Sequence, residues 1–185
     1  MKVGVLALQG DFAAHARMVT SAGAVAIEVR TTEQMADVDA LVLPGGESTT
    51  IRKLATAYGL IEPLRERARA GMPILGTCAG MIACAARIAD GNEPIIGCVD
   101  IDVRRNAYGR QVDSFEADIA VTGVGEMRAI FIRAPRIERT GDGVEVLARH
   151  AGEPVVVRQG AVVLAAFHPE LTDDDRLHRL AFEGG

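Results

Sequence analysis

Short apolar runs alternate with amphipathic segments through the first half of the chain. The apolar runs have the length of buried strands and occupy residues 3–8, 25–30, 40–43 and 73–77. Helices are predicted at residues 12–22, 49–58, 61–70 and 79–89. Asp11 stands where it can cap the first of these helices, and a glycine directly follows each of the first three. Because buried strands that alternate with helices pair in parallel, we expect a parallel sheet with helices on both faces.

From about residue 95 the pattern changes to short strands separated by turns that contain Gly or Asp. Strands are predicted at residues 99–103, 114–121, 129–132, 144–149, 154–158 and 161–167, and a last helix at residues 173–182. The sequence therefore predicts an α/β fold with one mixed sheet, parallel at its centre and extended by antiparallel strands. No linker, repeat or low-complexity segment interrupts the chain, so a single domain over residues 1–185 is expected.

Composition and charge exclude several classes of protein. Hydrophobic residues make up 49% and charged residues 24%, which excludes intrinsic disorder. The net charge of −5 and the lack of a basic run argue against a nucleic-acid partner. No apolar stretch approaches the ~18 residues that cross a bilayer. The apolar run at the start of the chain is too short for the hydrophobic region of a secretory signal. The three cysteines and four histidines show no metal-binding spacing, so we expect a cytoplasmic protein without a metal or cofactor.

Residues 76–80 read Gly-Thr-Cys-Ala-Gly and lie where a predicted buried strand runs into a predicted helix. This is the setting of a nucleophile elbow, a tight turn that exposes its central residue, here Cys78. The flanking glycines are needed because a Cβ at either position would collide with a neighbouring element. A helix N-terminus also favours a thiolate. The pattern favours Cys78 as a nucleophile over a buried structural cysteine, which is the interpretation we prefer for Cys84 and Cys98.

Residues 168–170 read His-Pro-Glu and follow the last predicted strand. Because proline keeps the preceding residue out of helical geometry, we expect an extended segment in which His168 and Glu170 point to the same side. Glu170 would then orient the imidazole for proton exchange with Cys78. Alone, this tripeptide is better interpreted as a surface turn, but together with the elbow it predicts a Cys-His-Glu triad. The remaining histidines are expected to be solvated or to lie behind the site: His15, His150 and His178.

The third predicted strand leads into Leu-Pro-Gly-Gly-Glu-Ser-Thr-Thr at residues 43–50. Two glycines before a helix allow backbone N–H groups to approach a ligand closely. A phosphate loop is disfavoured because no Gly-Lys-Ser or Gly-Lys-Thr follows. We expect an oxyanion site instead, formed by the N–H of Ala79 after the nucleophile and the N–H of Gly46. A plain tight turn is the alternative.

Together these segments resemble the triad-type (class I) glutamine amidotransferases, which release ammonia from the side-chain amide of glutamine. Further blocks narrow the resemblance to one subfamily, the glutaminase subunits of pyridoxal 5′-phosphate synthase. These blocks are Ala-Leu-Gln-Gly-Asp at residues 7–11, Arg-Asn-Ala-Tyr-Gly-Arg-Gln at 105–111, Phe-Ile-Arg-Ala-Pro at 131–135 and His-Pro-Glu-Leu-Thr at 168–172. The blocks at 105–111 and 131–135 are the specific ones, since other amidotransferases share the triad motifs. The blocks run in order over nearly the whole chain.

By position, the resemblance implies that Cys78 is the nucleophile, His168 the base and Glu170 its orienting group. It implies that the site for L-glutamine is lined by Gly46, Glu47, Ser48, Arg105, Ile132 and Arg133. A guanidinium such as that of Arg105 suits a carboxylate, as do the hydroxyl and N–H groups at Ser48. For Arg133 the backbone is expected to matter more than the side chain.

The resemblance also implies a three-layer, flavodoxin-like fold and a partner, the barrel-shaped synthase subunit, in a large hetero-oligomer. That subunit would use the ammonia to make pyridoxal 5′-phosphate from ribose 5-phosphate and glyceraldehyde 3-phosphate. Two alternatives stay open. One is a glutaminase serving another acceptor, as in histidine biosynthesis, or a γ-glutamyl hydrolase. The other is a chaperone, redox-sensing or structural subunit of similar fold, although such a protein has no need of the His-x-Glu motif.

Overall fold

The computed structural model describes residues 1–105 and 114–182, and its centre is a seven-stranded sheet. The strands lie in the order β10 (Glu145–His150), β11 (Glu153–Gln159), β12 (Val162–Ala165), β4 (Ile74–Thr77), β3 (Ala40–Leu43), β1 (Lys2–Leu6) and β2 (Val25–Val29). The five strands from β12 to β2 pair in parallel, and β10 and β11 extend them in antiparallel fashion. The predicted mixed sheet with a parallel centre is confirmed.

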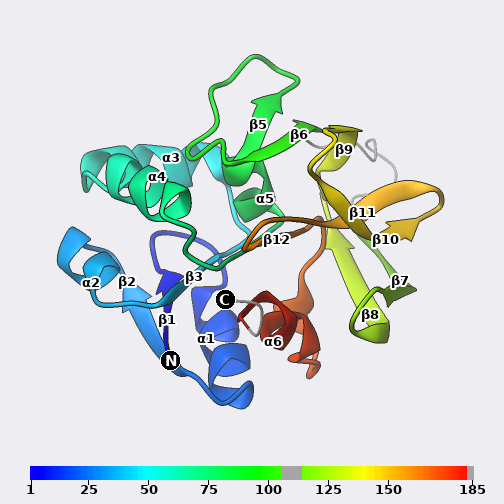
Figure 1. Ribbon diagram of the computed structural model, residues 1–185, viewed down its shortest axis with the longest axis horizontal. Coiled ribbons are helices and arrows are strands. Elements are labelled where there is room, and N and C mark those ends of the chain that lie inside the picture. Colours follow the sequence, from blue (N-terminus) through cyan, green and yellow to red (C-terminus); the bar gives the residue numbers. More distant parts are fainter. Residues whose placement is uncertain (106–113, 183–185) are drawn as a thin grey trace.

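Helices cover both faces of this sheet (Figure 1). The first group, below the sheet in that view, is α1 (Phe12–Ser21) and α6 (Arg176–Phe182). The second group, above the sheet, is α3 (Ser48–Ala57), α4 (Ile61–Arg69) and α5 (Ala79–Cys84). The side chain of Asp11 accepts a hydrogen bond from the N–H of Ala14, so Asp11 caps α1 as the sequence predicts. The result is the expected three-layer α/β arrangement.

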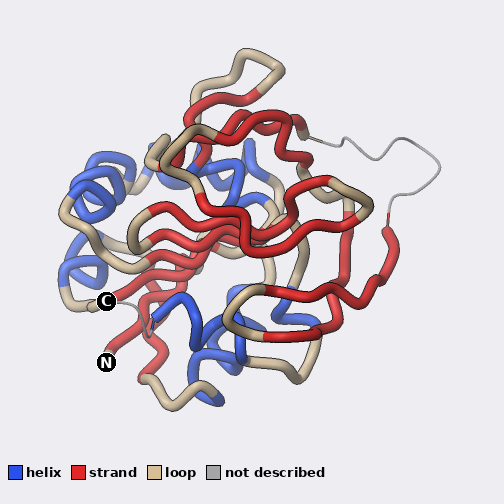
Figure 2. Tube along the Cα trace, turned by 45° about the vertical axis from the view of Figure 1, so that its right-hand side comes forward, coloured by secondary structure: helices blue, strands red, loops and turns tan. Residues whose placement is uncertain are grey.

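Two smaller sheets lie beside the main one, where the sequence analysis expected a single mixed sheet (Figure 2). One contains β5 (Ala85–Ile88), β6 (Val99–Arg104) and β9 (Arg136–Thr140). The other is the hairpin of β7 (Ser114–Val121) and β8 (Gly125–Ile132). The apolar pattern identified most of these strands, but it does not encode which strands pair, because pairing depends on contacts distant in sequence.

Three local predictions were wrong or incomplete. The helix expected at residues 79–89 ends at Cys84, because the next residue, Ala85, is extended and pairs with Val99 in a neighbouring strand. The short helix α2 (Thr32–Ala36) was not predicted, although its capping box of Thr31 and Gln34 is readable in the sequence. Strand β9 was missed because only Ile137 on it is buried.

No helix among residues 1–105 and 114–182 is long and apolar enough to cross a membrane.

We expect Gly80→Ala to destabilise the fold by about 1–3 kcal/mol, the usual cost of overpacking a close contact. A Cβ at this position would lie 2.0 Å from the carbonyl oxygen of Leu43, which is backbone and cannot move aside freely. Urea denaturation followed by circular dichroism measures the change in midpoint. Gly143→Ala is the matched control, since its Cβ would meet nothing closer than 3.5 Å. An unchanged midpoint for Gly80→Ala would contradict the packing argument.

Candidate active site

Three adjacent parallel strands bring the predicted site together. Strand β4 pairs with β3 on one side and with β12 on the other, so the carboxyl ends of all three meet at one edge of the sheet. Residue 78 follows β4 directly, the loop with Gly45 and Gly46 follows β3, and His168 follows β12 by three residues. The order of strands, and not proximity in sequence, therefore brings these groups together.

Cys78 adopts the strained backbone of an elbow. It has φ 48° and ψ −101°, a conformation that residues with a Cβ rarely adopt, and it is the N-cap residue of α5. Its N–H donates to the carbonyl of Ala165 at 2.9 Å, which fixes the turn to the neighbouring strand. A Cβ on Gly76 would lie 2.7 Å from the side chain of Leu164, and one on Gly80 would clash with backbone, so both glycines are required as predicted.

His168 and Glu170 form a short contact, with His168 Nδ1 2.7 Å from Glu170 Oε1. The local geometry differs from the prediction, because Pro169–Leu171 forms a 3₁₀ turn where an extended segment was expected. Proline at the first position of such a turn has a suitable φ and no N–H to leave unpaired, which explains the difference. The turn still leaves both side chains on one side. Glu170 is only 3% exposed and lies behind the imidazole.

The imidazole of His168 lies against Cys78. A Cβ built on Gly45 would be 2.4 Å from His168 Cε1 and 3.3 Å from Cys78 Cβ, so all three residues meet at one point. Burial by itself lowers the pKa of His168, but the contacts with Cys78 and with the Glu170 carboxylate outweigh burial and raise that pKa to about 10. The ring is therefore positively charged at neutral pH.

An open cavity of about 400 Å³ lies over Cys78. Eight of the residues predicted for the site line it: Gly46, Glu47, Ser48, Cys78, Arg105, Ile132, Arg133 and His168. Two lining residues, Gln9 and Ile82, were not predicted as site residues. The sulfur of Cys78 lies 3.9 Å from the carbonyl oxygen of Ile132, so the end of β8 forms one wall above the nucleophile. The cavity has both polar and apolar lining residues and has room for a small amino acid.

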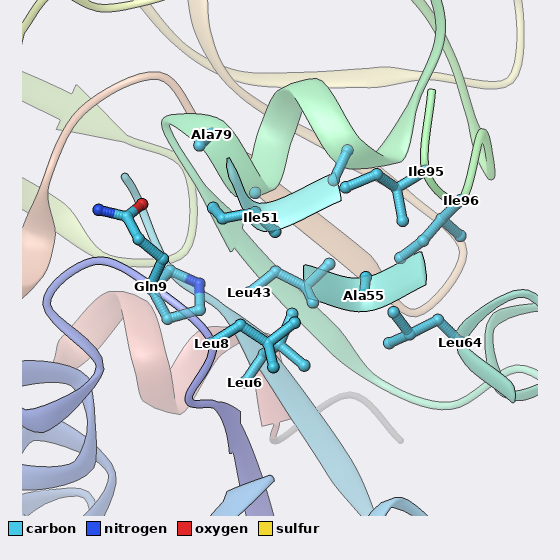
Figure 3. Close-up of a pocket in the computed structure, with 13 residues that line it drawn as sticks. Leu6, Leu8, Gln9, Leu43, Ile51, Ala55, Leu64, Ala79, Ile95 and Ile96 are labelled. Atoms are coloured by element: carbon cyan, nitrogen blue, oxygen red, sulfur yellow. The ribbon is translucent and has the colours of Figure 1, made fainter. Parts of the chain in front are cut away.

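Ala79, the other predicted oxyanion donor, lies at the first position of α5 and lines a neighbouring, more enclosed pocket (Figure 3). That pocket is formed by apolar side chains of several elements, such as Leu43, Ile51 and Ile95, with Gln9 at one end. None of its lining residues is charged or nucleophilic. The side chains that could take part in chemistry therefore line the open cavity and not this apolar pocket.

Glu47 takes part in the site through its backbone. Its carboxylate accepts hydrogen bonds from the N–H groups of Thr49 and Thr50 and caps α3. The hydroxyl of Thr50 also donates to it and, as the strongest of these contacts, lowers the pKa of Glu47 to about 2. The N–H of Glu47 donates to Gln9 Oε1 at 2.6 Å, so the side chain of Gln9 holds the peptide bond that follows Gly46.

Arg105 lines the cavity and is positioned by two partners. Its guanidinium donates to Ser48 Oγ at 3.1 Å and forms an ion pair with Asp90. The rest of its specific sequence block, residues 106–111, lies outside the described residues. Arg133 has φ 43°, a second strained backbone at the same cavity, which agrees with a role for its backbone. Guanidinium and hydroxyl together present donors to a carboxylate.

Sequence reasoning missed a polar cluster behind the triad. Of the two places expected for His15 and His178, the structure shows the one behind the site: both are fully buried, and His15 Nε2 lies 3.2 Å from Glu170 Oε2. Thr77 is also fully buried and contacts His15. No sequence signal links residues 15 and 170, because their contact arises only from the packing of α1 under the sheet. His150, half-buried, stacks on Phe115.

Within residues 1–105 and 114–182, no group of three or more His, Cys, Asp or Glu side chains is arranged to hold a metal ion.

Known proteins resemble this chain over nearly its whole length. Residues 5–183 match the model of the SNO glutamine amidotransferase family. A protein of Acidothermus cellulolyticus named pyridoxal 5′-phosphate synthase subunit PdxT is 60% identical over 96% of this chain and 90% of its own length. The protein of the same name from Frankia alni is 57% identical over 97% of this chain and 92% of its own.

Solved structures agree. A crystal structure titled glutamine amidotransferase has a TM-score of 0.93 and 51% sequence identity, covering 98% of this chain and 97% of the other. The PurLQS structure from Thermotoga maritima, at 16% identity and a TM-score of 0.74, covers 99% of this chain and 95% of the other and shows the shared fold alone. These matches confirm the resemblance that the sequence blocks indicated, and the chain belongs to the SNO glutamine amidotransferase family.

Proposed function

We propose that this chain hydrolyses L-glutamine to L-glutamate and ammonia with Cys78, His168 and Glu170, and passes the ammonia to a pyridoxal 5′-phosphate synthase subunit. One observation carries the proposal. A strained cysteine at a helix N-terminus and a histidine held by a buried carboxylate face one open cavity, which Arg105 also lines. This combination provides a nucleophile, a proton carrier and a carboxylate-binding group at one site.

In the proposed reaction, Cys78 Sγ attacks the carboxamide carbon of glutamine. The N–H groups of Gly46 and Ala79 stabilise the oxyanion that forms. His168 gives its proton to the leaving nitrogen, the C–N bond breaks, and ammonia departs from a γ-glutamyl thioester on Cys78. A water molecule then gives a proton to His168 and attacks the thioester carbon. Glutamate leaves, and Cys78 regains its starting state.

The lining of the cavity supports recognition of an amino acid. The guanidinium of Arg105, already aligned by Ser48 and Asp90, would bind the α-carboxylate of glutamine with paired hydrogen bonds. Because these partners restrict the side chain before substrate arrives, little conformational entropy is lost on binding. The backbone of Ile132 and Arg133 would line the same cavity.

The partner is proposed to be the barrel-shaped synthase subunit, in a large hetero-oligomer. The relatives from Acidothermus and Frankia, which carry the name of a pyridoxal 5′-phosphate synthase subunit, favour this acceptor over another such as that of histidine biosynthesis. The chain itself has only two lysines, Lys2 and Lys53, and no block that resembles a sugar-phosphate site. The acceptor chemistry would therefore lie on another polypeptide.

Docking of that partner is proposed to adjust the oxyanion loop. Gln9 holds the N–H of Glu47, and Gly46, at φ 153°, has the backbone freedom to reorient when that contact changes. The loop around Leu8, Gln9 and Gly10 is the candidate docking face. We further propose that residues 1–185 act as one domain in the cytoplasm, where the three free cysteines would stay reduced.

Cys78→Ala is expected to lower glutaminase activity by at least about 10⁴-fold, as removal of a nucleophile does, with little change in the unfolding midpoint. A diazo-ketone analogue of glutamine should label the wild-type protein once, on the peptide that contains Cys78. Peptide mass mapping checks the site of labelling. The buried Cys84 is the internal control, and labelling of Cys84 or Cys98 in place of Cys78 would refute the assignment.

Glu170→Gln should retain roughly 10- to 100-fold more activity than His168→Ala, because a carboxylate that orients the ring contributes less than the group that carries the proton. Steady-state kinetics at saturating glutamine gives the comparison, with circular dichroism to establish that both variants are folded. Equal and complete loss in a folded Glu170→Gln protein would mean that the carboxylate does more than orient. Wild-type activity in that variant would mean that another group holds His168.

Mixing this chain with the purified synthase subunit, glutamine, ribose 5-phosphate and glyceraldehyde 3-phosphate should produce pyridoxal 5′-phosphate. Glutaminase activity should rise on mixing, because docking completes the oxyanion site. Absorbance of the product and sedimentation of the complex are the measurements. The Cys78→Ala protein is the matched control and should support synthesis from ammonium but not from glutamine. If the mixture with the wild-type chain makes pyridoxal 5′-phosphate from ammonium but not from glutamine, and no complex sediments, this partner is excluded.

A further inference from the structure

The proposed mechanism uses Glu170 but gives no role to the other members of a buried polar cluster around it. Four side chains form it: His15 on α1, Thr77 at the end of β4, Glu170 behind the imidazole of His168, and His178 on α6. None of the four is more than 3% exposed. We refer to them as the histidine cluster. A buried polar group lowers the stability of the fold unless it is paired, so each member of the cluster depends on its contacts with the others.

Both carboxylate oxygens of Glu170 face a histidine nitrogen. Oε1 lies 2.7 Å from His168 Nδ1. Oε2 lies 3.2 Å from His15 Nε2 as an ion-pair contact, and no hydrogen-bond partner reaches it from the described residues. His15 is therefore the group that offsets the burial of the second oxygen. Because each carboxylate oxygen has a neighbour, the carboxylate cannot rotate about the Cγ–Cδ bond of Glu170 without breaking one of these contacts.

The protonation of His15 toward the triad follows from its neighbours. An ionised carboxylate can only accept, so the stable arrangement has the proton of His15 on Nε2. On the other side, His15 Nδ1 lies 2.9 Å from His178 Nε2. Burial, and then the neighbouring His15, lower the pKa of His178 to about 3, so His178 is neutral. Whether His178 donates to Nδ1 or accepts from it, a proton on His15 Nε2 lies within reach of Glu170 Oε2 at 3.2 Å and of Thr77 Oγ1 at 3.1 Å.

The histidine cluster also reaches the oxyanion loop. His15 Nε2 lies 3.1 Å from Thr77 Oγ1, and this hydroxyl accepts a hydrogen bond from the N–H of Gly45 at 3.1 Å. Thr77 immediately precedes Cys78, and Gly45 immediately precedes Gly46. One imidazole nitrogen is thus in contact with the carboxylate behind the base and with the hydroxyl that anchors the loop on the other side of the nucleophile.

From this geometry we propose that His15 is a positioning residue of the active site: its Nε2–H fixes the Glu170 carboxylate, and through it the ring of His168. This inference rests on the proposed glutaminase function. His178 acts one step further away by holding the ring of His15. The role differs from that of a buried structural histidine, since it predicts an effect on the reaction that does not follow the effect on stability.

Electrostatics gives the direction of the effect. Burial acts to raise the pKa of the Glu170 carboxyl, but the contacts with His15 and His168 outweigh it and hold that pKa well below its usual range. Loss of the His15 contact should therefore raise the pKa of Glu170. Because the ionised form orients His168, the acid limb of the pH profile of kcat/KM would move to higher pH. The charged groups nearest to the histidine cluster are His168 and, near His178, Asp174 and Asp175.

The test compares His15→Gln with His15→Asn in the full-length chain, assayed with the synthase partner. The amide nitrogen of glutamine reaches the place of Nε2 and can donate to Glu170, whereas asparagine reaches only the place of Nδ1. We expect His15→Asn to lower kcat about 10- to 100-fold, the range seen when a metal-bound histidine loses its orienting partner, and His15→Gln to stay within about threefold of wild type. KM for glutamine should change little in both. His150→Gln, which changes a histidine outside the histidine cluster that stacks on Phe115, is the control and should retain its kcat.

Two results would overturn the proposal and leave only a structural role for His15. One is an equal kcat, per folded molecule, for His15→Asn and His15→Gln. The other is a pH profile of kcat/KM whose acid limb is unchanged in His15→Asn. If His15→Asn does not fold, the Glu170→Gln background removes the buried charge. In the Glu170→Gln background, His15→Asn should fold and should not lower kcat further. If kcat fell in this background as much as it does in the wild-type background, the proposal would also be overturned. The rate at which iodoacetamide labels Cys78, followed by mass mapping, measures the reactivity of Cys78 beside His168 and needs no catalytic turnover. It should fall at pH 7 in His15→Asn but not in His15→Gln, so the role of His15 is tested even if Cys78→Ala shows that hydrolysis lies elsewhere.

Discussion

The site depends on the adjacency of three parallel strands. Because β4 lies between β3 and β12, the ends of these strands bring Cys78, the loop with Gly45 and Gly46, and His168 to one edge of the sheet. The strands contain almost only buried residues, so their register is strongly specified, and a shift of one residue would turn every side chain to the opposite face. The rigid sheet thus positions groups that are separated by about ninety residues in the chain, such as Cys78 and His168.

That rigidity also supports strain at the cavity. Cys78 and Arg133, at φ 48° and 43°, both line the open cavity and carry a Cβ in a region that costs of order 1–3 kcal/mol per residue. The hydrogen bond from Cys78 to Ala165 and the packing of Gly76 and Gly80 against neighbouring backbone hold the elbow in place. The strain turns Cys78 toward the cavity at the start of α5, where the helix N-terminus favours a negative charge.

Charge burial is the second constraint on the site. A carboxylate almost removed from water, as Glu170 is, is tolerated only with close partners. Here the partners are two histidines on opposite sides, one from the same turn and one from α1 beneath the sheet. The charge of Glu170 is therefore stabilised both by His168 and by His15 from the helix layer below the sheet. The loop above β3 joins these groups through the contact of Thr77 with Gly45.

The sequence by itself predicted most of the elements and the residues proposed for the chemistry. Local apolar patterns and glycine positions predicted the parallel core and the elbow at Cys78, and His-Pro-Glu predicted a base beside a carboxylate, because these signals depend on neighbours within a few residues. The tertiary structure alone decided which strands share a sheet, why the helix after Cys78 stops at Cys84, and that Pro169 begins a 3₁₀ turn. It also brought His15 to Glu170, a contact across more than 150 residues. Such contacts arise from the packing of layers, and a pattern with a period of two or 3.6 residues carries no information about them.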